Sequence, residues 1–63
     1  MTRRTPTEFA VLLLRLADEQ SFACRMALQR GDQVAARAAL AECMAALKDA
    51  QVALDAMTQR EAA

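Results

Sequence analysis

Residues 26–40 read MALQRGDQVAARAAL and decide the fold, because one break separates two stretches that favour helix. Gly31 is the only glycine of the chain, and glycine readily takes the left-handed conformation in which many helices end. Asp32 follows it and suits the first position of a new helix, because its carboxylate can accept hydrogen bonds from free backbone N–H groups. A turn this short predicts two antiparallel helices packed as a hairpin.

The outer boundaries of the two helices are also marked in the sequence. Residues 5–8 read TPTE: Thr5 suits the cap, Pro6 the first helical position, and Glu8 the third residue of a capping box. We therefore expect a single domain with a first helix over about residues 6–30, a turn at 31–32, and a second helix over about 33–58. Residues 59–63 are expected to fray.

The composition favours an all-α protein. Alanine and leucine dominate, together with straight-chain residues that favour helix, while the chain has one Gly, one Pro and no Trp or Tyr. A β-protein of this size needs frequent turn residues and many β-branched or aromatic side chains. A chain of 63 residues is also too short to bury most of its surface, so disulfides or association with another chain are expected to complete its core.

The charge balance narrows the choice of partner. Eight basic and eight acidic residues give a net charge of zero, whereas nucleic-acid and membrane-surface binders usually carry a basic face. The longest apolar run, residues 9–14, is shorter than the roughly 20 residues that span a bilayer. Arg3 and Arg4 precede this run as in a signal peptide, but Pro6 and Glu8 interrupt the pattern. We expect a cytoplasmic protein without a membrane segment.

Apolar residues at alternating steps of three and four predict a coiled-coil-like seam between the helices. Gln20 is the one polar member: it either reaches water at the edge of the seam or fixes the register of packing. The predicted layers are small near the turn and larger toward the open end. The expected seam of the second helix contains Ala36, Leu40, Cys43, Leu47, Ala50, Leu54 and Met57. That of the first contains Phe9, Leu13, Leu16, Gln20, Ala23 and Ala27.

Both helices carry further apolar residues outside this seam, and a monomer cannot cover them. Two explanations stay open. Two hairpins can pair as a homodimer, giving an antiparallel four-helix bundle, or a different protein can dock as an obligate partner. Interface cores favour aromatic, Met and Arg residues, so the expected partner-binding residues are those on the back of the first helix. These are Val11, Arg15, Phe22, Arg25 and Met26.

Residues for catalysis or cofactor binding are lacking. The chain has no His, no Tyr and no Gly-rich phosphate loop, and two Cys cannot complete a four-ligand metal site. Asp18 and Glu19 are neighbours that diverge on a helix, so they do not form an acid–base pair. Cys24 and Cys43 are expected to be reduced, small core residues. We predict a non-catalytic protein without cofactor or metal.

Two family resemblances suggest a function for such a hairpin. Residues 30–40, continuing into Cys43, resemble the turn and second helix of a tetratricopeptide repeat, with a small Ala36 and a large Leu40. In length and plan the chain resembles the two-helix co-chaperones of type III secretion, which pair with a tetratricopeptide chaperone to hold a needle subunit. It is also similar to small phage-encoded inhibitors. These resemblances imply a cytoplasmic protein that holds or inhibits another protein.

A further resemblance implies a different partner. The plan and length resemble the RNA-binding hairpin dimer that regulates plasmid copy number, a family that presents basic, polar and aromatic side chains from its paired first helices. Here Phe22 with Arg15 and Arg25 matches that set, although Asp18 and Glu19 intervene and the first helix has no Lys. RNA binding is therefore the alternative to the predicted protein-binding function.

Overall fold

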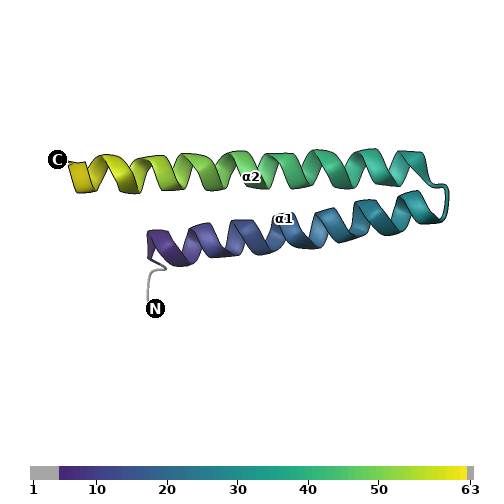
Figure 1. Cartoon of the computed structure of the whole chain (residues 1–63), viewed down its shortest axis with the longest axis horizontal. Coiled ribbons are helices and arrows are strands. Elements are labelled where there is room, and N and C mark those ends of the chain that lie inside the picture. Colours follow the sequence, from purple (N-terminus) through teal and green to yellow (C-terminus); the bar gives the residue numbers. More distant parts are fainter. Residues whose placement is uncertain (1–4, 63) are drawn as a thin grey trace.

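The computed structural model describes residues 5–62 as two α-helices packed side by side in opposite directions (Figure 1). Helix α1 spans Pro6–Gln29 and helix α2 spans Gln33–Ala62. The predicted all-α hairpin is confirmed. Helix α2 continues past its expected end near Thr58 as far as Ala62; Ala63 and residues 1–4, including Arg3 and Arg4, lie outside the described residues.

The turn between the helices is stabilised by backbone hydrogen bonds that end α1. The Asp32 N–H donates to the Ala27 carbonyl at 2.8 Å, and the Gly31 N–H donates to the Leu28 carbonyl at 3.1 Å. Gly31 has a φ of 77°, which lies in the left-handed region that favours glycine. This pair of bonds is the Schellman arrangement, which satisfies carbonyls at the end of a helix.

Both helices begin with a side-chain cap, as the sequence predicts. The Thr5 hydroxyl oxygen accepts a hydrogen bond from the Glu8 N–H at 3.1 Å, and Pro6 occupies the first helical turn. The Asp32 carboxylate accepts from the Ala35 N–H at 3.0 Å. Each cap satisfies a backbone donor that has no partner within the helix, which stabilises the helix start by about 1 kcal/mol.

The seam between α1 and α2 differs from the predicted one at six of the 13 predicted positions. Residues that alternate by three and four do form it, but every buried residue among those described is alanine except Cys43. Five of the predicted large members lie outside it: Phe9, Leu16, Leu40, Leu47 and Leu54 are 40–52% exposed, and Ala23 is exposed too. The buried residues are Ala10, Ala17, Ala27, Ala36, Ala39, Cys43, Ala46 and Ala50, with Leu13, Gln20, Cys24, Ala53 and Met57 half-buried in the same series.

Small side chains explain this rotated seam. Alanine and cysteine let two helix backbones approach closely and gain dispersion contacts that larger side chains would prevent. The helices converge toward the turn (Figure 1), where Ala27 and Ala36 are almost fully buried. Ala17 lies with Ala46 and Cys43 in the core, and the Thr7 hydroxyl donates to the Met57 sulfur at 3.8 Å near the open end. Two residues that lie opposite each other on α1 and α2, such as Ala17 and Ala46, therefore have residue numbers that sum to about 63.

The hairpin is a single layer of helices. Its extents are 49 × 27 × 12 Å, and the smallest of these matches the diameter of one helix. The Cα radius of gyration is 14.6 Å. A compact chain of this length would have a radius of gyration of about 10.6 Å. Both broad faces of the layer are therefore open.

Candidate functional site

One broad face of the hairpin carries a set of leucines that we call the leucine face. Each of these residues directly follows a seam residue, and residues at that position on two antiparallel helices project to the same side of the layer. All are between 43% and 59% exposed. The leucine face consists of Leu14 and Leu28 on α1 and Leu40, Leu47 and Leu54 on α2.

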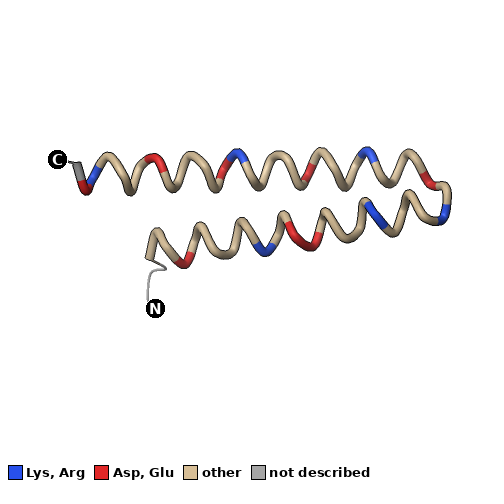
Figure 2. Tube along the Cα trace, in the orientation of Figure 1, with Lys and Arg blue, Asp and Glu red and all other residues tan. Residues whose placement is uncertain are grey.

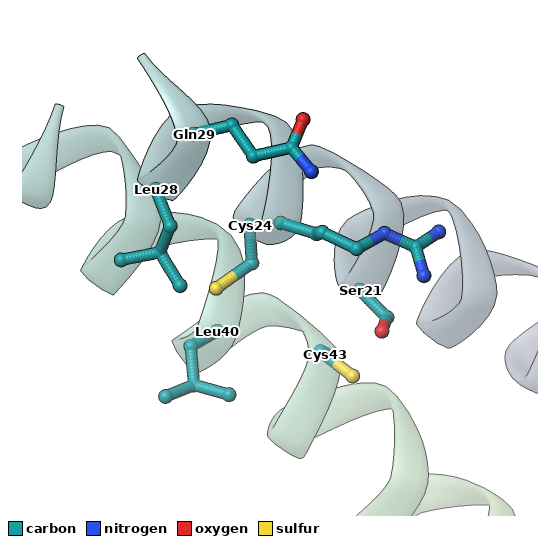
Figure 3. A pocket seen from close by; sticks show the side chains of 7 residues that line it. Ser21, Cys24, Leu28, Gln29, Leu40 and Cys43 are labelled. Atoms are coloured by element: carbon teal, nitrogen blue, oxygen red, sulfur yellow. The ribbon is translucent and has the colours of Figure 1, made fainter. Parts of the chain in front are cut away.

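The leucine face is hollowed near the turn. A shallow, open depression of about 440 Å³ lies between Leu28 and Leu40, with Ser21, Cys24 and Cys43 among the residues that line it. Figure 3 shows Leu28 from α1 and Leu40 from α2 at the side of this depression, with Cys24 between them. The hollow exists because the seam residues that line it are small. The thiols of Cys24 and Cys43 and the methyl groups of the two leucines suit an apolar side chain of another molecule, and Arg25 and Gln29 add polar groups to the lining.

Both cysteines are free thiols in this region. Cys43 is buried in the core, as predicted, whereas Cys24 is half-buried and lines the hollow instead of the core. Gln20 is half-buried at the edge of the same seam.

The five predicted partner-binding residues all lie outside the seam of α1, and Arg25 also lines the hollow between Leu28 and Leu40. We call this set, Val11, Arg15, Phe22, Arg25 and Met26, the outer face of α1. None is buried, and the Phe22 side chain is 55% exposed. An exposed aromatic ring on a helix in water is a candidate contact residue, because phenylalanine contributes a large apolar area when a partner covers it.

Two residues of the outer face of α1 are in direct contact. The Arg25 guanidinium carbon lies 5.6 Å from the centre of the Phe22 ring, a cation–π distance. Met26 is four residues from Phe22 and so lies on the adjacent turn of the same surface. Arg15 lies two turns away and Val11 three turns away. The residues thus form one contact pair with Met26 beside it, while Val11 and Arg15 extend the surface toward the start of α1.

The opposite broad face of the hairpin, which we call the acidic face, combines apolar and acidic residues. Phe9 and Leu16 precede seam alanines on α1, and Glu42 and Asp49 precede seam residues on α2. All four are exposed. The two broad faces therefore differ in charge.

Charges of both signs are interspersed along the two helices (Figure 2). One ion pair is present among residues 5–62: Arg30 and Asp32 approach to 3.8 Å across the turn, with both side chains exposed. The Arg-Gly-Asp tripeptide thus forms the turn itself. Within the same residues there is no group of three or more potential metal ligands, and neither helix is long and apolar enough to cross a membrane.

Comparison of the chain with protein-family models, with curated proteins and with solved structures gives no match. The function is therefore inferred from the surface of the hairpin itself.

The leucine face is the part of the surface that the sequence does not predict. Leu40, Leu47 and Leu54 were expected between the helices, but each stands on the surface. The sequence does allow the observed seam, because Ala39, Ala46 and Ala53 precede these leucines and continue the alternation of three and four residues equally well.

Proposed function

We propose that this chain is a non-catalytic protein-binding module that holds or inhibits another protein. The observation that supports this proposal is the inversion of side-chain size between interior and surface. The described interior contains only alanine and one cysteine, while Phe22, Leu28 and Met44 are each more than half exposed. Soluble monomers rarely leave large apolar patches open, and such patches commonly mark interaction sites.

The energetic consequence of covering these side chains is large. Full burial of one Leu, Met, Val or Phe side chain stabilises a complex by about 1.5–3 kcal/mol. Several such residues together exceed the free energy that association costs in lost translational and rotational freedom. On the outer face of α1, Phe22 with Arg25 and Met26 supplies the aromatic, cationic and sulfur-containing groups that concentrate binding energy at interfaces.

The distribution of charge favours a protein over RNA as the partner. Arg15 and Arg25 flank Phe22, but Asp18 lies between them, one turn from both Arg15 and Phe22, and the chain has zero net charge. RNA binding depends on cations that neutralise several phosphates at once. A protein surface with both apolar and acidic groups suits this mixed face better.

Affinity capture tests the proposal. The tagged chain is incubated with RNase-treated lysate of its source organism, in parallel with Phe22→Asp and Val34→Asp variants. Val34 is 82% exposed at the start of α2, away from the outer face of α1, so it controls for adding an acidic group. We expect one protein at stoichiometric yield with the wild type and with Val34→Asp, and at least a tenfold loss with Phe22→Asp at unchanged helicity.

Two results would contradict the proposal. Recovery of the same protein by Phe22→Asp at full yield would exclude the outer face of α1 as its binding site. A complex that forms only without RNase treatment, and that weakens steeply as salt is added, would instead indicate RNA as the ligand.

A further inference from the structure

We infer that a second copy of this chain covers the leucine face, with two hairpins packed face to face around a twofold axis and their turns at opposite ends. This inference deepens the proposed function and rests on it for the use of the remaining surface. The second copy covers one side of the hairpin, and Phe22 on the outer face of α1 stays open for the partner protein.

The exposed area indicates that a large surface needs cover. The chain exposes 5300 Å². A compact monomer of 6.9 kDa would expose about 4,000 Å². The excess is about 1,300 Å² per chain, or roughly 2,600 Å² for two copies. Permanent dimers bury about 2,000–5,000 Å² in total. Two copies of the chain together therefore offer as much excess surface as a stable dimer buries.

Charge selects the leucine face as the contact between copies. The charged residues beside Leu28 and Leu40 of the leucine face are the basic Arg25 and Arg37, which line its hollows, whereas the acidic face carries Glu42 and Asp49. In the proposed arrangement the axis crosses α2 near Ala45, the middle of the paired region. Pairing through the acidic face would place Glu42 of one copy level with Asp49 of the other. Like charges held together in an interface oppose association.

The shape of the leucine face is self-complementary when the turns lie at opposite ends. On α2, Leu40, Met44, Leu47, Gln51 and Leu54 alternate by four and three, the spacing of an antiparallel coiled-coil contact. With the axis near Ala45, Met44 of one copy lies beside Leu47 of the other. The leucines at the open end of each hairpin then approach the hollow near the turn of the other, and this happens twice.

Charged residues at the edges favour the same orientation. With the turns at opposite ends, Arg37 of one copy comes level with Asp55 of the other, which suits an ion pair. With the turns at the same end, the two hollows would face each other, and Arg25 would come level with the second copy's Arg37. Both arginines line the hollows, so that arrangement would bring like charges together. Asp18 lies near the axis on α1 and therefore comes level with Asp18 of the other copy. Arg15 of each copy lies one turn away and offsets this repulsion.

Sedimentation equilibrium tests the contact face. Wild-type chain is expected at about 14 kDa, twice the chain mass of 6.9 kDa. Leu47→Glu places an unpaired carboxylate in the contact and is expected to weaken self-association by at least ~100-fold. Val52→Glu is the matched control, because Val52 is 62% exposed on the same helix but away from the leucine face, and it should remain dimeric. A monomeric wild type, or a dimer that Leu47→Glu leaves intact, would overturn the inference.

Chemical cross-linking tests the orientation and does not depend on a folded monomer. Cys24→Ala and Cys43→Ala remove the native thiols, and a single cysteine is then introduced as Leu47→Cys or Leu28→Cys. A short bismaleimide should join two copies through position 47, which lies near the axis. Two copies of position 28 would be roughly 30 Å apart and should not react together, given 1.5 Å per helical residue. Cross-linking through position 28 instead would overturn the opposed turns.

The two proposals fail independently. Loss of the dimer in Leu47→Glu with no captured protein in any sample would support the second-copy contact and remove the proposed function. A monomeric wild type that still captures a protein through Phe22 would keep the function and remove the second-copy contact.

Discussion

Gly31 shows how a single residue supports the reversal of the chain. Its φ of 77° is unfavourable for any side chain with a Cβ atom, yet a Cβ built there would meet no atom within 4 Å. The cost of a substitution is therefore conformational and not steric. We predict that Gly31→Ala lowers the free energy of unfolding by about 1–2 kcal/mol, and thermal denaturation followed by circular dichroism measures it.

Two companion variants separate the backbone effect from the loss of charge at the turn. Gly31→Asn should cost less than Gly31→Ala, because asparagine tolerates the left-handed conformation. Arg30→Ala removes the exposed ion pair with Asp32 and should change the melting temperature little. Equal losses in all three variants would show that the conformation of Gly31 does not limit stability.

Features at the residue scale were the most predictable from sequence. Thr5, Gly31 and Asp32 act through bonds to atoms within five positions along the chain, so their roles follow from local backbone geometry. No knowledge of the packing partner is needed to assign a cap.

At the scale of the helix, the sequence allowed two seams and favoured the wrong one. Ala36, Cys43 and Ala50 belong to both, and either the leucines at 40, 47 and 54 or the alanines at 39, 46 and 53 complete the alternation. Burial of apolar area favours leucine for an isolated hairpin. The choice depends on how closely the helices approach and on what covers the remaining face, which are tertiary and quaternary properties.

The alanine seam predicts that a larger side chain destabilises the hairpin only on the side of α2 that faces α1. Ala46 is 3% exposed beside Ala17 and Cys43. Ala46→Leu should therefore force the helices apart and lower the free energy of unfolding by about 1–3 kcal/mol, measured by chemical denaturation. Its neighbour Ala45 is exposed, so Ala45→Leu is the matched control and should have a small effect. A free energy of unfolding raised by Ala46→Leu would contradict the observed seam.

For the whole molecule, the second-copy contact predicts that stability depends on protein concentration. Unfolding of a dimer releases two chains, so a tenfold increase in concentration adds about 1.4 kcal/mol to its stability. The melting temperature of the wild type should rise by several degrees when the protein concentration is raised from about 5 to about 50 µM. The melting temperature of Leu47→Glu should not change. A constant melting temperature for the wild type would contradict association through the leucine face.

The sequence predicted surplus apolar surface at this scale but not its location. Counting apolar residues outside one seam was sufficient to expect an association. Assigning the face required the rotation of each helix about its own axis, because a shift of one position moves a side chain by about 100° around the helix.

Because Thr7 and Met57 are close together, a covalent linker between two copies of the chain can report how the copies are oriented. The start of α1 and the end of α2 lie at one end of the hairpin (Figure 1). A tandem gene with two copies of the chain could therefore join same-end hairpins through a short linker. Hairpins with opposed turns would need a linker that spans roughly 36 Å, the length of a 24-residue helix. The shortest linker that preserves a compact single-chain bundle thus acts as a ruler for the orientation of the two copies.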